Sequence, residues 1–391
     1  MDPVRTDTGD LTLDGYTVRG YRFAQPHSLG VRMTEVQGFA ADGYEGVRET
    51  FQSFLDDGRE AGAGLSVWRG GKEVVNLRAG WADAARTTPW QPDTLVQPYS
   101  VSKPFAALAA LVAVRDGAVT LDEPIANHWA GYGRNGKESV TLRQVLSHQA
   151  GQPRFPAQAT DLLDDEALRA GLAAAPPEYV PGTAVGEHAL TYGHLIDGVL
   201  RAAANTTLGE VFGDVVRPAL DLDGWFGVPD TELGRVAELE YTDPSTSDTH
   251  PLKQWLTPPD GVLDLSRMNS REWRQSVFGA VNLHVSASAL ARFYAELPSP
   301  DGPVARLLGA DLHAEYLTPQ VRGHDQVFDT TLSWTLGFIR DDRKIAKGGL
   351  GGSAAWWSPR HDHGCAYLTR TLDDMSRAGQ LAAALGDDLS I

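Results

Sequence analysis

This sequence is poor in cysteine and in positive charge, and both shortages exclude classes of protein. Its single cysteine, Cys365, cannot form a disulfide within the chain. Lysine and arginine number 34 against 51 aspartates and glutamates, giving a net charge of −17. A surface of that charge repels the phosphates of nucleic acids and anionic lipids, so we expect neither a nucleic acid nor a membrane as a partner.

The sequence also lacks long apolar segments and metal-binding clusters. Its longest apolar stretch, from Phe105 to Val114, is too short to cross a bilayer. Residues 1–15 lack the basic start and the apolar core of a secretion signal, which predicts a cytoplasmic location. His361 and His363 lie in a predicted turn without a third ligand, so we expect no metal and no other cofactor.

Apolar residues make up 42% of the 391-residue chain, which is enough for a substantial core. Their spacing predicts helices over residues 46–60, about 100–116, 286–297 and about 373–385. Strand-like runs occupy residues 63–83, around a turn of two glycines, and residues 337–372, which read as three strands. The middle of the chain is helical in pattern, apart from a long loop over residues 242–261.

Strands at both ends of the chain, with helices between them, indicate a single sheet built from the two ends. We therefore predict an α/β (α+β) sandwich whose antiparallel sheet is flanked by helices. This domain comprises residues 1–117 and 276–391, and residues 118–275 form an all-helical subdomain that carries the long loop. The predicted active-site cleft lies between the two parts.

The segment Ser100-Val101-Ser102-Lys103 opens a predicted helix and carries the main chemical signal. Free backbone N–H groups and the positive dipole end at a helix start favour an oxyanion there. Residues three apart share one helix face, so the Lys103 amine can reach the Ser100 hydroxyl and take its proton. That step requires a neutral lysine, which burial or a neighbouring cation would provide. Alone, the pattern also fits an N-cap serine with a surface lysine.

Further motifs accompany this pattern in a fixed order along the chain. They are GAGLSVWRGGKEVVNLRAGWAD, TLVQPYSVSKPFAALA, LDEPIANHWAGYG, VTLRQVLSHQAGQP, PGTAVGEHALTYGHLIDGVL and KGGLGGSAAWWSP. From about Val36 to Thr371 the chain thereby resembles the serine β-lactamase and penicillin-binding superfamily, within it the group of class C lactamases, family VIII esterases and related transacylases. The resemblance implies a β-lactamase/transpeptidase-like fold, with Ser100 as the acylated nucleophile and Lys103 as its general base or proton relay.

Against this resemblance Glu187 is unusual, because the family has a proton-handling tyrosine at this position, just after the Pro-Gly-Thr segment. The nearby Tyr192 matches a packing aromatic of the family, so we expect it to face the core. Glu187 then has an acid/base role, a salt bridge or a substrate contact, or the tyrosine's role is lost. Beside Lys103 an ionised carboxylate would hold the lysine charged, whereas a buried neutral carboxyl would donate a proton.

The third motif begins at Lys347, where many related esterases have histidine and class C lactamases have lysine. Three roles are open for this cation: it lowers the pKa of the nucleophile's lysine, binds a substrate carboxylate, or pairs with Glu187, which is the role that we favour. The glycines after it, Gly349 among them, allow a substrate to approach the backbone closely. By resemblance, the oxyanion is bound by the N–H groups of Ser100 and of a residue near Leu350.

Two further side chains are predicted at the substrate-binding site. His188 adjoins Glu187 in the sequence, and Trp255 lies in the long loop, which makes it a candidate for the rim of the cleft. His148, in contrast, belongs to a helix-end motif of the family and is predicted to be structural. Asn282 falls in a family segment beside the site, without an assigned role.

The sequence favours a serine acyl-transfer enzyme that forms an acyl-enzyme on Ser100 and cleaves a carboxylic ester. The alternative is a transacylase that moves the acyl group to an amine or alcohol in a biosynthetic pathway. A β-lactamase or peptidase is less favoured because of the predicted location. An inactive binding homologue is opposed by the intact Ser-x-x-Lys pattern and favoured by Glu187 in place of the family tyrosine. In each catalytic case the partner is a small-molecule ester or amide, and the oligomeric state is open.

Overall fold

The protein is described from a computed structural model, which covers residues 35–243, 245–372 and 374–390. These residues fall within one compact unit. The segment in which we predicted no secretion signal, residues 1–15, lies outside the described residues. The predicted division into residues 1–117 with 276–391 and residues 118–275 stays a prediction.

A large antiparallel sheet of nine strands organises the described part of the chain. The strand order is β1-β3-β2-β11-β10-β9-β8-β7-β6, so strands from the two ends of the chain meet in its centre. Its strands are β1 (Gln37–Ala40), β2 (Gly62–Arg69), β3 (Lys72–Gly80), β6 (Val321–Asp325), β7 (Thr330–Trp334), β8 (Ile339–Arg340), β9 (Ile345–Gly348), β10 (Ala354–Ser358) and β11 (His363–Thr369). A separate two-stranded sheet joins β4 (Gly224–Trp225) to β5 (His284–Val285).

Helices cover both faces of the large sheet and fill the middle of the chain. The α-helices are α1 (Glu45–Asp56), α2 (Lys103–Arg115), α3 (Leu142–Leu146), α4 (Asp165–Ala174), α5 (Thr191–Ala204), α6 (Leu208–Val211), α7 (Arg217–Leu220), α8 (Thr246–Thr249), α9 (Lys253–Leu256), α10 (Leu265–Met268), α11 (Arg271–Gln275), α12 (Ala287–Glu296), α13 (Pro303–Leu308), α14 (Ala310–Leu317) and α15 (Ser376–Ala384). Short 3₁₀ turns are η1 (Tyr99–Ser102), η2 (Ile125–Asn127) and η4 (Leu233–Arg235), and η3 (Phe212–Val216) is a π-helical turn.

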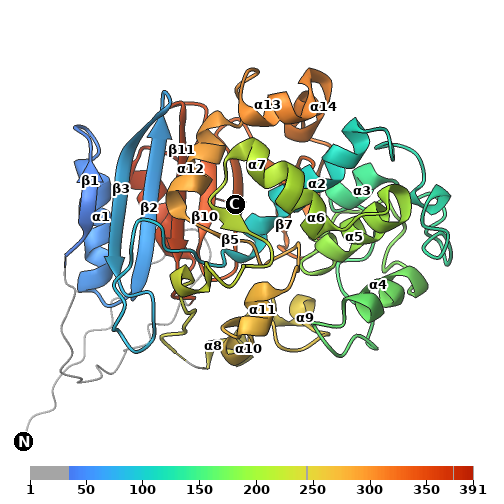
Figure 1. Ribbon diagram of the computed structural model, residues 1–391, viewed down its shortest axis with the longest axis horizontal. Helices are drawn as coiled ribbons and strands as arrows, with labels where there is room; N and C mark the ends of the chain where they lie inside the picture. The colour runs from blue at the N-terminus through green and yellow to red at the C-terminus, as the bar shows by residue number, and fades with distance from the viewer. Residues whose placement is uncertain (1–34, 244, 373, 391) are drawn as a thin grey trace, which may run out of the picture. The chain divides into compact units, whose positions relative to one another are not determined.

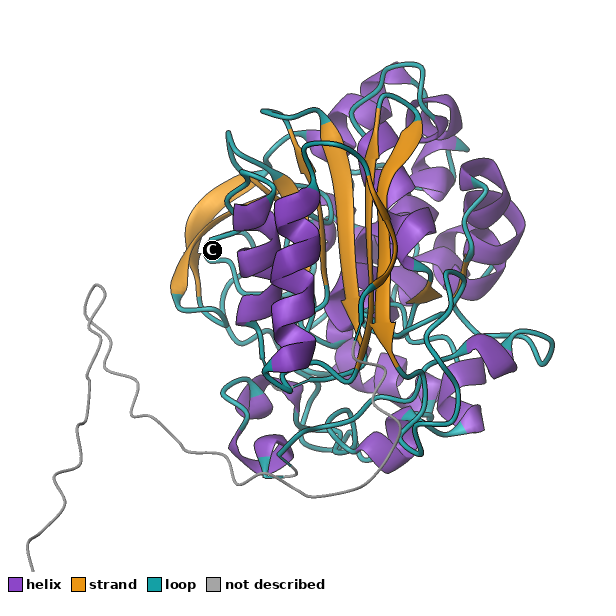
Figure 2. Cartoon of the chain, turned by 90° about the vertical axis from the view of Figure 1, so that its left-hand side faces the viewer, coloured by secondary structure: helices purple, strands orange, loops and turns teal. Residues whose placement is uncertain are grey.

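The central strands are buried on both faces, as their composition requires. In β2, Ala63, Leu65 and Val67 alternate with the residues of the opposite face and pack with α1 and α15. In β11, Ala366 and Leu368 point to the other core, where α12 lies against β11 and β2. Figure 1 shows α1 and α12 on opposite sides of the strands, and Figure 2 views the sheet from the α1 side.

Helix α2 is apolar on nearly every side, and this composition buries it in the second core. Its residues from Lys103 to Ala113 are all buried, and it packs against α5 and η3. A helix without a polar face belongs in the protein interior. Because Lys103 is the first residue of α2, its amine is carried into the protein and not into solvent.

The predicted fold class, an antiparallel sheet flanked by helices, is confirmed. The helices predicted at 46–60 and 286–297 are α1 and α12, and the predicted strand pair over 63–83 is β2 and β3. Residues 337–372 hold four strands, β8 to β11, where three were predicted. Strands β1, β6 and β7 were not predicted. The segment 242–261 is not wholly irregular, because it contains the one-turn helices α8 and α9, and β4 interrupts the helical middle segment.

Candidate active site

The Ser100 hydroxyl stands at a tight 3₁₀ turn immediately before α2. Tyr99, the buried residue before it, has φ +48°, a conformation that aromatic residues rarely adopt. The turn is tied to its surroundings: the Ser102 hydroxyl donates to Tyr99 O at 2.6 Å and accepts from Leu283 N at 3.1 Å. The Tyr99 hydroxyl donates to Val262 O at 3.4 Å. Ser100 itself is half-buried, unlike the buried Tyr99 and Val101 on either side of it.

The Lys103 amine meets Ser100 as the Ser-x-x-Lys spacing predicts. Its Nζ donates to Ser100 Oγ at 2.8 Å, to Ala189 O at 2.9 Å and to Ala280 O at 3.4 Å, and the residue is fully buried. Burial lowers the pKa of Lys103 to about 8; nearby Glu187 raises it in part and Lys347 lowers it further. A lysine with this pKa is neutral in part near neutral pH, as a general base must be.

Glu187 and Lys347 form the salt bridge that we favoured from the sequence. Lys347 Nζ lies 2.6 Å from Glu187 Oε1, and Lys103 Nζ lies 3.4 Å from the same oxygen. All three side chains are buried. Burial alone raises the pKa of Glu187, but the two ammonium groups outweigh it and lower the pKa to about 2. Glu187 is therefore an ionised acceptor, which favours the salt bridge over the neutral proton donor considered above.

The unpredicted strands β6 and β7 hold this salt bridge in position. Asp325, at the end of β6, accepts the Glu187 N–H at 3.2 Å through Oδ1 and the Trp334 indole N–H at 3.0 Å through Oδ2. The ring of Trp334, in β7, lies 4.3 Å from Lys347 Nζ, so it faces the ammonium as a cation–π partner. Sequence reasoning missed both residues, and the alternation in Thr330–Trp334 was the only available indication of a strand.

The turn after β9 passes directly against the nucleophile. A Cβ added to Gly349 would lie 1.9 Å from Pro98 O and 3.4 Å from Ser100 N, so only glycine fits there. Gly349 N donates to Ser353 O at 2.8 Å, which closes the turn. The next residue, Leu350, is half-buried. Oxyanion binding by the N–H groups of Ser100 and Leu350 stays a prediction, and the close approach of the two segments is consistent with it.

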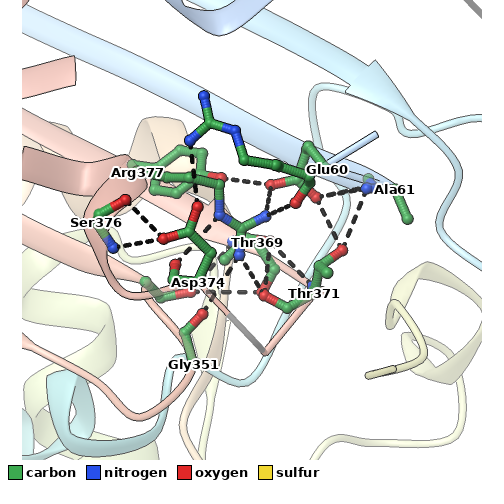
Figure 3. Close-up of polar contacts among 12 residues, drawn as sticks. Glu60, Ala61, Gly351, Thr369, Thr371, Asp374, Ser376 and Arg377 are labelled. Atoms are coloured by element: carbon green, nitrogen blue, oxygen red, sulfur yellow. Dashed lines mark hydrogen bonds and ion pairs between the residues drawn. The ribbon is translucent and has the colours of Figure 1, made fainter. Parts of the chain in front are cut away.

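A buried arginine of α15, Arg377, donates a hydrogen bond to the turn after β9 (Figure 3). The Arg377 guanidinium pairs with Glu60 at 2.8 Å and donates to the carbonyl oxygens of Arg59 at 2.6 Å and Gly351 at 3.5 Å. Neither Arg377 nor Glu60 was singled out from the sequence, because a lone charged pair far apart in the chain has no recognisable spacing. The network fixes the loop that carries Leu350.

His188, which we predicted to line the substrate site, is fully buried and engaged at both ring nitrogens. Its Nδ1 lies 2.9 Å from Gly186 O, and its Nε2 accepts from Gln152 N at 3.3 Å. Burial lowers the pKa of His188 to about 4. No ring nitrogen is left for a substrate, so the structure favours a packing role over the predicted contact. His148 Nδ1 accepts the backbone N–H of His188 at 3.1 Å, in keeping with the predicted structural role of His148.

The remaining predicted residues lie at the edge of the site or in the core. Trp255, in α9, is half-buried with the Arg154 guanidinium 4.9 Å from its ring, so its place on the rim stays a prediction. Tyr192 is fully buried and donates to Leu146 O at 3.1 Å, as expected for a core residue. The Asn282 side chain is bound to its own loop, including Phe278 N at 2.7 Å, which gives it a structural role.

No cluster of three or more potential metal ligands occurs among the residues that the structure describes. His363, part of the pair examined for metal binding, lies 2.6 Å from Asp387 Oδ2 and is buried. Within the same described ranges, no helix has the length and apolar character needed to cross a membrane.

Comparison with known proteins agrees with this geometry. A family model described as beta-lactamase matches residues 47–388. The chain belongs to the beta-lactamase family. Among curated proteins, this beta-lactamase-family chain is 34% identical over 210 residues to the esterase/beta-lactamase LipL of Mycobacterium tuberculosis, a match covering 52% of this chain and 48% of LipL. The match thus spans about half the length of that curated relative.

Solved structures extend the likeness over nearly the whole fold of this beta-lactamase-family member. A penicillin-binding protein homolog from Caulobacter crescentus superposes with a TM-score of 0.78 at 30% identity, covering 90% of this chain and 99% of the homolog. A family VIII carboxylesterase gives a TM-score of 0.77 at 29% identity, covering 90% of this chain and 98% of the esterase. The β-lactamase/transpeptidase-like fold expected from the sequence is thereby confirmed.

Proposed function

We propose that this protein hydrolyses carboxylic esters through an acyl-enzyme on Ser100. The observation that carries the proposal is the 2.8 Å contact between Lys103 Nζ and Ser100 Oγ, with Lys103 fully buried and Ser100 half-buried. A partly neutral lysine in contact with a serine is an activated nucleophile. The similarity to a protein described as an esterase/beta-lactamase and to a carboxylesterase supports the ester as the substrate class.

Acylation begins when neutral Lys103 takes the proton of the Ser100 hydroxyl and Oγ attacks the ester carbonyl. The oxyanion is stabilised by the N–H groups of Ser100 and Leu350, next to the close approach at Gly349. The carbon–oxygen bond to the alcohol then breaks, and the Lys103 ammonium returns its proton to the leaving oxygen. Lys103 is neutral again, ready for the second half of the reaction.

Deacylation repeats the same proton movements with water. Lys103 takes a proton from water, the hydroxide attacks the acyl carbonyl, and Ser100 Oγ leaves with the proton that Lys103 returns. Glu187, at 3.4 Å from Lys103 Nζ, is ionised throughout and acts on this cycle through its charge. In this chain a salt bridge to Lys347 therefore replaces the proton-handling tyrosine of the family.

Mass spectrometry of the protein mixed with p-nitrophenyl butyrate tests the proposal. We expect release of p-nitrophenol and a butyryl adduct on the peptide containing Ser100. The Ser100→Ala variant should form no adduct, and its turnover should fall at least about a thousandfold, because the nucleophile is removed. Undiminished turnover by Ser100→Ala, with circular dichroism showing an intact fold, would place the chemistry elsewhere.

Transfer of the acyl group to an amine or alcohol remains the alternative fate of the acyl-enzyme. Both fates share the acylation step, so they separate only in deacylation. Adding primary amines during turnover distinguishes them: amide formed at the expense of butyrate indicates transfer, and unchanged butyrate indicates hydrolysis. The acceptor thus decides between a hydrolase and a transacylase.

A further inference from the structure

Neither lysine beside Ser100 offers a free positive charge to a substrate. Lys347 Nζ is bound to Glu187 Oε1 at 2.6 Å and faces the Trp334 ring at 4.3 Å, and its side chain is 1% exposed. Lys103 Nζ is bound to Ser100 and to two backbone carbonyls. A carboxylate on a substrate would therefore have to displace an existing buried ion pair to reach an ammonium.

Under the mechanism proposed above, the leaving group of the ester departs on the side of Glu187. Lys103 returns its proton to the leaving oxygen, so that oxygen departs close to Lys103 Nζ, which is 3.4 Å from Glu187 Oε1. The ion pairs of the carboxylate run through Oε1, and Oε2 accepts no hydrogen bond from any residue in the described ranges. An ionised oxygen without a donor attracts N–H and O–H groups and repels anions.

The charges of Lys103, Glu187 and Lys347 sum to zero in the state that reacts. When Lys103 is neutral, the positive Lys347 and the negative Glu187 sum to zero within a buried volume. No net charge is then available to offset the loss of hydration of a substrate carboxylate. The net charge of −17 on the whole chain opposes the approach of anions as well.

We propose that Glu187 is a specificity determinant, through which the site rejects esters whose leaving alcohol carries a carboxylate and accepts their uncharged counterparts. The inference rests on the ester hydrolysis proposed above. It assigns to the Glu187–Lys347 pair a role in substrate choice, separate from its effect on the proton balance of Lys103.

Two aryl acetates of the same shape test the inference. 4-Acetoxybenzamide releases an uncharged phenol, whereas 4-acetoxybenzoate releases one that bears a carboxylate. Each kcat/KM is divided by the rate of the same ester with hydroxide, which removes the difference in intrinsic reactivity. We expect the corrected kcat/KM of the wild-type protein to be at least about tenfold higher for the amide-bearing ester, because like charges close together are strongly unfavourable.

The Glu187→Gln variant keeps the shape of the side chain, removes its negative charge and leaves the Lys347 charge unbalanced. We expect its selectivity to shift toward the carboxylate ester by at least about tenfold. Asp197→Asn is the matched control, because Asp197 is also buried and paired, with Arg169 and Arg201, but contacts neither Ser100, Lys103 nor Lys347. Its selectivity should equal that of the wild type.

The outcomes separate the inference from the function on which it rests. Equal corrected rates for both esters in the wild type overturn the inference and leave ester hydrolysis standing. Wild-type selectivity retained by an active Glu187→Gln variant assigns the discrimination to another residue and also overturns it. No turnover of either ester and no acetyl adduct on Ser100 refute ester hydrolysis itself. Where Glu187→Gln is inactive, the wild-type comparison can still overturn the inference, by giving equal corrected rates for the two esters.

Discussion

In the proposed mechanism, the charges beside Lys103 determine when its amine is neutral and when Ser100 can react. Glu187 stays ionised because two ammonium groups face one of its oxygens. Burial lowers the pKa of Lys103 to about 8, so its amine gives up its proton more readily than an exposed lysine does. A buried site with two lysines and one glutamate releases one proton more easily than an exposed lysine would, and that release creates the base.

The rate of acylation should rise with pH through the pKa of Lys103. Only the neutral amine can accept the Ser100 proton. We therefore expect kcat/KM to be low at pH values below the Lys103 pKa of about 8 and to reach a plateau at higher pH. The measurement is kcat/KM for p-nitrophenyl butyrate across this range, corrected for spontaneous hydrolysis. A rate that falls as the pH rises through this value would contradict Lys103 as the base.

Substitutions of the two charged neighbours should move this pH profile in opposite directions. Lys347→Met removes a charge that lowers the Lys103 pKa, so the rising limb shifts to higher pH. Glu187→Gln removes a charge that raises the Lys103 pKa, so the limb shifts to lower pH. The uncharged ester is used for both variants. Shifts in the same direction would show that the two residues act by a change of shape and not by charge.

Local spacing was enough to predict the part of the site that lies within one helical turn. Ser100 and Lys103 were predicted to meet, and they do at 2.8 Å. The Glu187–Lys347 pair was inferred from two unusual residues in motifs of the resembling family, and it is present. Asp325 could not be predicted, because it acts on the site by accepting the backbone N–H of Glu187, 138 residues earlier in the chain, and no spacing in the sequence reveals such a contact.

At the scale of elements, the turn after β9 must lie close to the turn before α2. Gly349→Ala would set a Cβ 1.9 Å from Pro98 O, so one of the two backbone segments has to shift. We expect kcat/KM to fall by about a hundredfold, the typical effect of a displacement of about 1 Å at a reacting centre. Gly348→Ala is the control, since its Cβ would meet no atom within 4 Å. Equal activity of the two variants would refute a tight approach.

Helices and strands with regularly spaced apolar residues were predictable from the sequence. Strands made mostly of exposed and half-buried residues were not. Helix α1 and the β2–β3 pair follow regular apolar spacing, because their buried faces belong to a single core. In β6, exposed and half-buried residues alternate until the buried Asp325, so the strand carries almost no apolar pattern. Its pairing with β7 comes from the sheet as a whole, which a local reading of the sequence cannot supply.

At the scale of the whole molecule, the ion pair between Arg377 and Glu60 connects α15 to the start of β2 (Figure 3). Both side chains are fully buried, so Arg377→Met would leave an unpaired carboxylate in the interior. We expect a loss of about 3–5 kcal/mol in the free energy of unfolding, measured with guanidinium chloride. Arg271→Met, which breaks an exposed pair with Asp230, should change it by less than about 1 kcal/mol. Similar losses for both variants would contradict this assignment.

The pairing of β2 with β11 sets residues 63 and 369 opposite each other in the middle of the sheet. A nascent chain leaving the ribosome cannot complete this pair until β11 has been synthesised. Contacts so distant in sequence slow folding. Before that point, Leu65 and Val67 have no covering strand on one edge, and they are exposed to aggregation or to capture by chaperones. The sheet in which β9 lies next to the Ser100 turn therefore cannot be complete before β11 has been synthesised.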